Sequence, residues 1–427
     1  MIVIDETHAP ALRSWVDSAN QPQTDFPIQN LPFGVFQRDG QEPRCGVRIG
    51  DQVLDLAALA GAQLIDPACA GSSLNLVMAL SSSQRQALRQ RLSALLQHGT
   101  DDRAMVEPHL VAVSQVRSLL PAVIGDYTDF YASIHHATNI GTMLRPENPL
   151  LPNYKYIPIA YHGRSSSVVV SGTPIRRPHG QTRNDPNAAP TFAASARLDY
   201  EIEIGAFVAQ GNALGTSIPI EQAEDYFFGV CLLSDWSARD VQGWEYQPLG
   251  PFLSKNFSTS ISPWIVTREA LAPFRSPAYQ RPASDPQPLD YLHSSADQLH
   301  GGIDVTVEVY LTSAAMRAKN LPALRLSQGN MRDLYWTTAQ MLTHHASNGC
   351  NLRPGDLLGS GTISGEAKES WGSLMELSWR GSKPIDLPSG ERRTFLEDGD
   401  EITLRGFAQR DGYVRIGLGE CRGVVIP

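Results

Sequence analysis

The chain has 427 residues, of which 42% are hydrophobic and 19% charged, as in soluble globular proteins. Its length favours two domains over one. The formal net charge of −9, without any run of Lys or Arg, argues against nucleic-acid binding. No apolar run approaches the roughly 20 residues needed to cross a membrane. We therefore expect a two-domain protein that binds neither nucleic acid nor a membrane.

The cysteines and the first residues bear on the cellular compartment. Five cysteines are scattered along the chain and none forms a CxxC pair, so neither a zinc site nor a disulfide framework is expected. Residues 1–8, MIVIDETH, lack the basic start and apolar core of a secretion signal. Both observations predict a cytoplasmic protein with reduced thiols.

Residues 1–120 are predicted to form a small mixed domain. Two short strands are expected within Arg44–Leu56, on either side of a turn at Gly50. A helix is expected behind capping residues at Ser81–Ser83, ending at Gly99. Its apolar positions recur with helical spacing: Leu88, Leu92, Leu95 and Leu96. Nothing in this domain points to a reaction.

From Gly125 onward, strand-like runs dominate and are separated by Gly, Pro and Asn turns. The predicted strands are Ser166–Ser171, Leu198–Val208, Val230–Asp235, Ile303–Leu311, Leu374–Trp379, Glu401–Gly406 and Tyr413–Leu418. Helical patterns are few, at Ile220–Phe228 and at Met331–Ser347, which follows a cap at Asn330. This balance favours a mainly β, sandwich- or roll-like body over a doubly wound sheet. We assign it to a second domain at 121–427.

The run Leu198–Gly205 alternates apolar and acidic residues with period two, which predicts a strand. Asp199, Glu201 and Glu203 would share one face, with neighbouring carboxylates roughly 6–7 Å apart. At an effective dielectric of about 20, each like-charge pair costs on the order of 2–3 kcal/mol. Taken alone, the run is best interpreted as a solvated strand face. In a pocket, these carboxylates would need protons or a hard divalent cation.

Several short motifs do not match the common site signatures. Gly359–Gly365 has the spacing GxGxxxG without a clear helix after it, so a turn-rich loop offering backbone N–H groups and the Thr362 hydroxyl is favoured over a dinucleotide site. The segment His162–Ser167 lacks the GxSxG spacing of a nucleophile elbow. Two pairs of adjacent histidines lack the i, i+4 spacing of a zinc helix: His135-His136 and His344-His345.

Two segments are dense in functional side chains. Asp126–Asn139 can be explained as a polar loop rich in caps and turns. Leu232–Tyr246 runs from an apolar strand into a predicted helical turn, where an ordinary helix start with an i, i+4 ion pair is the simpler explanation. Three of its polar residues would point the same way: Asp235, Arg239 and Gln242. Lys255 follows among small and apolar neighbours, where an amine tends to be functional or paired.

Together, these segments resemble the fumarylacetoacetate hydrolase family. The resemblance runs over nearly the whole chain, through DYTDFY (126–131), HATN (136–139), YHGRSSSVVVSGTPIRRP (161–178), LDYEIEIGAF (198–207), SDWSARDVQGWEYQPLGPFLSKNF (234–257), NLRPGDLLGSGTISG (351–365) and MELSW (375–379). So many long matches in order are very specific. The family implies a small N-terminal SH3-like barrel followed by a C-terminal β-roll, assembled as a homodimer. It also implies a small-molecule dicarboxylate diketone substrate, fumarylacetoacetate, hydrolysed in tyrosine and phenylalanine catabolism.

The resemblance also implies the roles of individual residues. The residues matching divalent-metal carboxylates, for Ca²⁺ and/or Mg²⁺, are Asp129, Glu201, Glu203 and Asp235. His136 matches the catalytic base and Glu376 its orienting partner. The oxyanion group is Arg239, Gln242 and Lys255. These three also contact substrate, with Tyr131, Arg145, Tyr161, Tyr246 and Thr362. A second, structural cation is placed at Lys255 and Thr259.

Two departures and two alternatives accompany this assignment. His135 stands where relatives often have Gln, and Ser258 stands where Gly is frequent, before Thr259. An acylpyruvate hydrolase, decarboxylase or isomerase of the same superfamily is the alternative enzyme, since one fold hosts different reactions. A Ca²⁺-stabilised β protein without turnover would leave His136, Glu376 and Lys255 without roles. Oxygen ligands alone do not distinguish Ca²⁺ from Mg²⁺.

Overall fold

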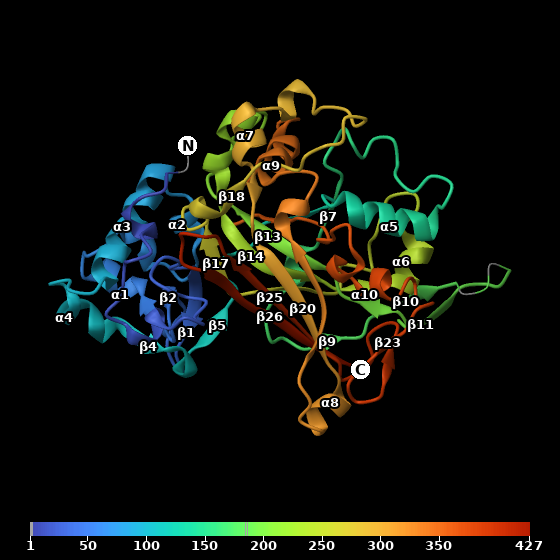
Figure 1. Cartoon of the computed structure of the whole chain (residues 1–427), viewed down its shortest axis with the longest axis horizontal. Helices are drawn as coiled ribbons and strands as arrows, with labels where there is room; N and C mark the ends of the chain where they lie inside the picture. Colours follow the sequence, from blue (N-terminus) through green and yellow to red (C-terminus); the bar gives the residue numbers. More distant parts are fainter. Residues whose placement is uncertain (1–2, 184, 186) are drawn as a thin grey trace.

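The computed structural model describes residues 3–183, 185 and 187–427 (Figure 1). The N-terminal part, in blue at the left of Figure 1, combines short strands with helices. Its strands are β1 (Phe33–Gln37), β2 (Arg44–Ile49), β3 (Gln52–Asp55), β4 (Leu110–Ala112) and β5 (Arg117–Leu119). Its helices are α1 (Leu56–Gly61), α2 (Asn75–Met78), α3 (Ser82–Leu96) and α4 (Arg103–Val106). Ser81 caps α3 in a capping box with Gln84, and the predicted leucines of this helix are buried.

A large sheet runs from the N-terminal part through the centre of the molecule. Its strands in the remainder of the chain are β6 (Tyr127–Phe130), β7 (Ala160–His162), β8 (Val168–Val170), β13 (Ile202–Val208), β14 (Phe227–Asp235), β16 (Thr259–Ile261), β17 (Trp264–Thr267) and β22 (Leu357–Gly359). The strand order is β4-β3-β2-β1-β17-β14-β13-β22-β6-β7, with β5 paired to β1, β16 to β14 and β8 to β16. The central strands β13 and β14 are buried along their whole length, so both faces of the sheet are covered.

The N-terminal part joins this sheet by direct strand pairing. Phe33 of β1 lies opposite Ile265 of β17 in an antiparallel register. The same hydrophobic core contains Leu54 and Leu92 from the N-terminal part and Leu233 from β14. The two parts of the chain therefore share both a ladder of hydrogen bonds and a core.

A second sheet, in the order β21-β20-β25-β26-β9, packs against the face of the large sheet that is opposite the core shared with the N-terminal part. Its strands are β9 (Ile175–Arg176), β20 (Thr306–Thr312), β21 (Leu324–Asn330), β25 (Glu401–Ala408) and β26 (Ile416–Ile426). Along β20 every second residue is buried, as period-two patterning requires of a strand with one face on a core. Val307 of β20 and Leu404 of β25 share a core with Ile204 and Leu232 of the central sheet.

The remaining elements are short. Two-stranded ribbons pair β10 (His179–Thr182) with β11 (Thr191–Ala194), β12 (Leu198–Asp199) with β15 (Ser237–Ala238), β18 (Arg275–Ser276) with β19 (Gly302–Ile303), and β23 (Ile385–Asp386) with β24 (Arg392–Arg393). The helices are α5 (Ile134–Leu144), α6 (Arg239–Glu245), α7 (Ser295–His300), α8 (Ala314–Ala318), α9 (Thr338–Ala346) and α10 (Leu374–Leu377). The 3₁₀ turns are η1 (Glu6–His8), η2 (Asp17–Asn20), η3 (Pro67–Ala70), η4 (Glu107–His109), η5 (Val113–Gln115), η6 (Ser165–Ser167), η7 (Ile220–Tyr226), η8 (Ala272–Phe274), η9 (Asp290–Leu292), η10 (Met331–Asp333) and η11 (Lys368–Ser370).

The predicted mainly β architecture holds as a mixed fold dominated by sheets. In the described residues these sheets are open and close no barrel. The strand pair around Gly50 and the helix behind Ser81 are confirmed. No helix in this part of the chain is both long enough and apolar enough to span a membrane. All five cysteines are free thiols.

Three predicted elements are wrong. Leu374–Trp379 is not a strand: Ser373 caps the helix α10 there, its Oγ accepting from the N–H of Glu376. Met331–Ser347 is not one helix, because η10 ends at Asp333 and Thr337 caps a separate helix, α9. Ile220–Phe228 is the 3₁₀ turn η7 followed directly by β14.

The predicted strand Leu198–Val208 is interrupted. Its first two residues form β12 and pair with β15, whereas β13 starts at Ile202 and pairs with β14 and β22. At the break, Glu201 and Asp235 exchange backbone hydrogen bonds of 3.0 and 3.1 Å. Asp199 and Glu201, which lie on either side of β12's end, both accept hydrogen bonds from Arg239.

Candidate active site

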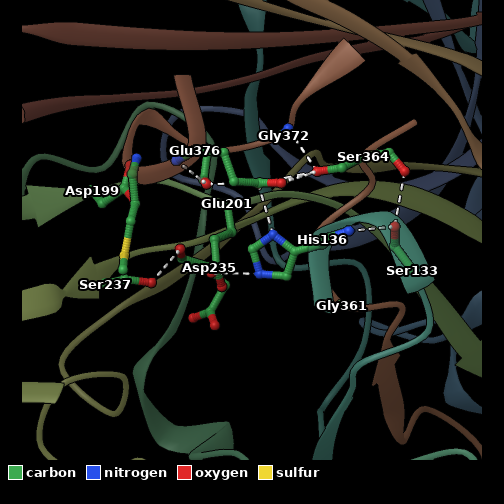
Figure 2. A network of polar contacts seen from close by, with 12 residues as sticks. Ser133, His136, Asp199, Glu201, Asp235, Ser237, Gly361, Ser364, Gly372 and Glu376 are labelled. Atoms are coloured by element: carbon green, nitrogen blue, oxygen red, sulfur yellow. Dashed lines mark hydrogen bonds and ion pairs between the residues drawn. The ribbon is translucent and has the colours of Figure 1, made fainter. Parts of the chain in front are cut away.

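His136 lies in the first turn of α5 and points into the interior (Figure 2). Ser133 caps this helix, its Oγ accepting from the backbone N–H of His136 at 3.2 Å. The imidazole is buried, with Nδ1 2.7 Å from Oε2 of Glu376 and Nε2 3.5 Å from Oε1 of Glu201. The ring is therefore held between two carboxylates, from α10 and from the break between β12 and β13.

The electrostatics of this pair favour charge on both members. Burial lowers the pKa of His136, but the negative charge of Glu376 and the contact with Glu201 outweigh it and raise the pKa to about 9. Burial also opposes ionisation of Glu376, yet the charge of His136 and a set of hydrogen bonds keep its pKa below the ordinary value. An imidazole oriented by a carboxylate in this way is suited to accept a proton at its other nitrogen.

Three carboxylates from neighbouring strands converge beside the histidine. Asp129 of β6, Glu203 of β13 and Asp235 of β14 each bring an oxygen within 4.8 Å of the others. Gly359 of β22 lies directly opposite Asp129 in the sheet, and a side chain there would collide with the Asp129 carboxylate. All three acids are buried. The sheet thus concentrates negative charge at one place in the interior.

This cluster is short of positive partners. Oδ1 of Asp129, Oε1 of Glu203 and Oδ1 of Asp235 accept no hydrogen bond from any described residue. Burial raises the pKa of Glu203 well above its usual value, and the charges of Asp129 and Asp235 add to the effect. Burial raises the pKa of Asp235 to about 8, even though Lys255 opposes the shift. Buried carboxylate oxygens without donors are the ligand set that a hard divalent cation prefers.

Glu201, the fourth predicted metal carboxylate, lies outside this group of three. Its Oε1 accepts from Nη2 of Arg239 at 2.6 Å, and its Oε2 contacts the ammonium of Lys255. Lys255 also donates to Oδ2 of Asp235 at 2.6 Å, so it bridges Glu201 and the acidic cluster. Burial lowers the pKa of Lys255, but these acids outweigh it and raise the pKa above its usual value.

Arg239 and Gln242 share one face of the short helix α6, as their spacing predicts. Nη1 of Arg239 donates to the side-chain oxygen of Gln242 at 3.0 Å, and Nε donates to Asp199 at 2.9 Å. Asp199 also accepts from the backbone N–H groups of Leu374 and Met375 at the start of α10. One buried aspartate therefore connects the Arg239 helix to the Glu376 helix.

Of the residues predicted to contact substrate, Tyr131 and Tyr161 touch this centre directly. The Tyr131 ring meets that of His136 edge-on, with centroids 5.4 Å apart. The Tyr161 hydroxyl donates to Oδ2 of Asp235 at 3.0 Å. Nε of Arg145 is buried without a partner among the described residues. Thr362 is buried in the loop after β22, and Tyr246 is half-buried at the C-terminal end of α6.

A cavity of about 260 Å³ opens beside the acidic cluster on the Lys255 side. Tyr161, Lys255 and Thr259 line it, together with Arg164 and Asn256. Thr259 pairs with Asp235 across β16 and β14. The structure thus brings Thr259, predicted at a second cation site, next to the carboxylate cluster. His135 instead stacks edge-on against Tyr279, with centroids 6.2 Å apart.

Four site residues escaped the sequence reasoning. Asp199 was recognised only as part of the acidic run, and its bonds to α6 and α10 depend on the strand break. Asn139 lies three residues after His136, a helical spacing that could have signalled a shared partner. Ser373 also bonds Glu376, and its S-x-x-E spacing to Glu376 is a helix-cap signal; Ser364, which bonds the same carboxylate, sits in a loop where the sequence carries no such signal.

Comparison with known proteins places this geometry in a family. The profile described as "Fumarylacetoacetate (FAA) hydrolase C-terminal" matches residues 126–426, and "Fumarylacetoacetase N-terminal" matches 29–121. The chain belongs to the fumarylacetoacetate hydrolase family. Within the family it is 48% identical to the fumarylacetoacetase of Rattus norvegicus over 416 residues, covering 95% of this chain and 97% of the relative. Identity to the fumarylacetoacetase of Arabidopsis thaliana is 45% over 429 residues, covering 97% and 99%.

A solved structure of the family shows the same fold. The fumarylacetoacetate hydrolase from psychrophilic Exiguobacterium antarcticum superposes with a TM-score of 0.51 at 18% identity. The match covers 93% of this chain and 99% of that one. At such low identity the likeness bears on the fold alone.

Proposed function

We propose that the protein hydrolyses 4-fumarylacetoacetate to fumarate and acetoacetate, the last step of tyrosine and phenylalanine catabolism. The observation that carries this proposal is an identity of 45–48% to fumarylacetoacetases of animals and a plant, over at least 95% of the chain. The buried His136–Glu376 pair, beside three acids that each have one oxygen without a donor in the described chain, supports it. Hydrolysis of a carbon–carbon bond requires a base for water and a means to stabilise a carbanion.

The reaction adds water to the carbonyl carbon next to the fumaryl group. The C–C bond between that carbon and the methylene of the acetoacetyl part then breaks. Its electron pair leaves as the enolate of acetoacetate, which takes up a proton. The fumaryl carbon retains the water oxygen and departs as fumarate.

His136 is the base in this proposal. Nδ1 faces Glu376 at 2.7 Å, so in the neutral form of the ring, which the two neighbouring carboxylates disfavour, the proton resides on Nδ1 and Nε2 can accept a proton from water. General-base catalysis of this kind contributes typically 10²–10⁴-fold to a rate. Burial of both side chains keeps competing water away from the pair.

Asp129, Glu203 and Asp235, with Glu201, are the residues that would hold Ca²⁺ or Mg²⁺. The three orphaned oxygens and the raised pKa of Asp235 support this assignment, since a dication would compensate charges that no described donor satisfies. When bound, such an ion supplies Lewis-acid stabilisation of negative charge on the substrate. The same donor set leaves the choice between the two metals to cavity size.

Arg239, Gln242 and Lys255 are proposed to stabilise the negative charge that develops on the attacked carbonyl oxygen. Arg239 and Lys255 are already fixed by buried carboxylates, so little reorganisation is required during the reaction. One such donor typically contributes about 3–4 kcal/mol to transition-state stabilisation. The substrate carboxylates would be bound by Arg145 and the tyrosines.

The remaining substrate contacts are proposed at Tyr131, Tyr161, Tyr246 and Thr362. Lys255 and Thr259 are proposed to lie at a second, structural cation. The family resemblance further supports a cytoplasmic homodimer. It also supports an SH3-like N-terminal unit at residues 1–120 and a β-roll at 121–427.

The decisive experiment is turnover of fumarylacetoacetate by the purified protein, with Mg²⁺ or Ca²⁺ and with a chelator. We expect loss of substrate absorbance, release of fumarate and acetoacetate in equal amounts, and loss of activity with the chelator that added metal restores. Acylpyruvates serve as the competing substrates. Faster turnover of an acylpyruvate than of fumarylacetoacetate would contradict the substrate assignment. Activity that is unaffected by the chelator would contradict the proposed dependence on a divalent metal.

A further inference from the structure

We propose that Ser364 is a positioning residue of the reaction, which fixes Glu376 and through it the imidazole of His136. The inference rests on the proposed role of His136 as base. Ser364 lies in the loop after β22, and its Oγ is 3.0 and 3.1 Å from the two carboxylate oxygens of Glu376 (Figure 2). It is completely buried and would touch neither substrate nor metal.

The direction of this hydrogen bond is fixed by a neighbour. Oγ of Ser364 accepts from the backbone N–H of Gly372 at 3.0 Å. A backbone N–H can only donate, so the single hydroxyl proton of Ser364 remains available for the Glu376 carboxylate. The Ser364 hydroxyl is thereby oriented as a donor before any substrate binds.

Two further donors complete the arrangement around Glu376. Ser373 donates to Oε2 at 2.8 Å while its Oγ accepts from the N–H of Glu376, which fixes its polarity in the same way. Nδ2 of Asn139 donates to Oε1 at 2.9 Å. A carboxylate that accepts from three oriented donors is held as an anion. Because this carboxylate can only accept, Nδ1 of His136 must donate to it. The imidazole proton therefore resides on Nδ1.

Ser364 additionally holds the helix that carries the histidine. Its backbone oxygen accepts from Oγ of Ser133 at 2.8 Å, and that Oγ in turn accepts from the N–H of His136. One residue therefore contacts the cap of α5 through its main chain and the carboxylate from α10 through its side chain. Loss of the hydroxyl should loosen the carboxylate and leave the cap in place.

The same loop also contacts the acidic cluster. The N–H of Gly361, three residues before Ser364, donates to Oε2 of Glu203 at 3.1 Å. The backbone N–H of Ile363 donates to the carbonyl of Ile202 at 2.8 Å, which pins the loop to the start of β13. Ser364 thus positions the base on the same segment of backbone that contacts a proposed metal carboxylate.

The test compares Ser364→Ala with Ser14→Ala in the metal-loaded, full-length protein. Ser14 is a matched control, since its buried hydroxyl donates to a backbone carbonyl, Leu96, at 2.7 Å in the N-terminal part. For Ser364→Ala we expect kcat to fall about 10- to 100-fold with KM changed less than about twofold, as for loss of a hydrogen bond to a charged group. Ser14→Ala should keep both constants.

A spectroscopic measurement separates positioning from loss of structure. The Nδ1 proton of His136, bonded to a carboxylate, should give a downfield proton NMR signal, assigned by its absence in His136→Ala. In Ser364→Ala the signal should shift or broaden, and in Ser14→Ala it should be unchanged. If Ser364→Ala fails to fold, Asn139→Ala and Ser373→Ala test the same set of donors with the same readouts.

Two outcomes would overturn the inference. One is an unaltered kcat and an unaltered His136 signal in Ser364→Ala. The other is a loss confined to KM, which would make the residue a substrate contact. Both are judged relative to the parent on whichever substrate the parent cleaves, so a failure of the fumarylacetoacetate assignment would be recognised separately.

Discussion

Asp400 and Asp129 are both buried, at 0% and 2% exposure, yet they sit in opposite electrostatic surroundings. Asp400 accepts two hydrogen bonds from the guanidinium of Arg393, at 2.8 and 3.1 Å, and a third from the N–H of Glu397. Asp129 has one oxygen without a donor in the described chain, and its nearest neighbours include two more acids. Two aspartates with equal burial thus differ in whether the fold neutralises them.

The difference separates a structural acid from a functional one. A buried charge that the fold pairs completely contributes to stability or fold specificity, whereas one left unpaired is a cost that a ligand can relieve. Asp297 is an intermediate case, since Oδ1 accepts from Thr337 at 2.9 Å while Oδ2 has no partner among the described residues. The three residues give a graded series that mutation to Asn can test.

The largest effect is expected for Asp129→Asn. Activity with saturating divalent cation should fall by roughly 100-fold or more, because one hard ligand is lost. Without metal, the same variant should unfold at a higher temperature than the parent, since one of several buried like charges is removed. Calorimetric titration with Mg²⁺ or Ca²⁺ and thermal unfolding with a chelator measure the two effects. Unchanged metal affinity and activity would refute the ligand assignment.

Asp400→Asn should act in the opposite way. Arg393 would lose its buried carboxylate, and we expect the free energy of unfolding to fall by about 3–5 kcal/mol. Below the unfolding temperature, kcat should be unaltered. Denaturant unfolding measures the loss, with Asp398→Asn as a control, because Asp398 pairs with Arg177 at a more exposed site, where about 0–1 kcal/mol is expected. Equal losses of unfolding free energy for Asp400→Asn and Asp398→Asn would show that burial does not determine how much each ion pair contributes to stability.

Asp297→Asn should give the smallest effect, and one that depends on pH. Burial raises the pKa of Asp297 to about 6 from 3.8, partly opposed by the bond from Thr337. The folded state therefore binds the Asp297 proton more tightly than the unfolded state does. The stabilisation of the folded parent by this proton is complete below about pH 4 and is lost as pH rises through about 6. As pH rises from about 4 to about 6, the free energy of unfolding of the variant should increase by on the order of 1–2 kcal/mol relative to that of the parent. Denaturant midpoints at pH 4.5 and 7.5 measure it; a constant difference would contradict the assignment.

Much of the site follows from sequence patterns because its residues lie on regular elements. Period-two alternation predicts that Asp199, Glu201 and Glu203 share one face, and spacing of three predicts that Arg239 and Gln242 lie together. In the structure Arg239 contacts Asp199, Glu201 and Gln242. The break before Ile202 could not be foreseen, since it results from pairing of the two flanking segments with different partners.

The strand predicted at Leu374–Trp379 runs against local signals, because Leu, Met and Glu favour helices and Ser373 and Glu376 have the spacing of a helix cap. Asp199, 175 residues before Leu374 in the chain, also accepts the first N–H groups of this helix. The role of Ser364 has a long-range cause, because its bond to Glu376 exists only when a loop and a helix meet.

The pairing of β1 with β17 has a consequence for how the chain can be divided. Two strands separate β1 from β13, which carries Glu203, and both belong to the same continuous sheet. Cutting the protein near residue 121 would leave β17 with a bare edge and strip Leu233 and Ile265 of apolar cover. The N-terminal part is consequently continuous with the part that carries the proposed site, and separating the two would break this strand pairing and expose their shared core.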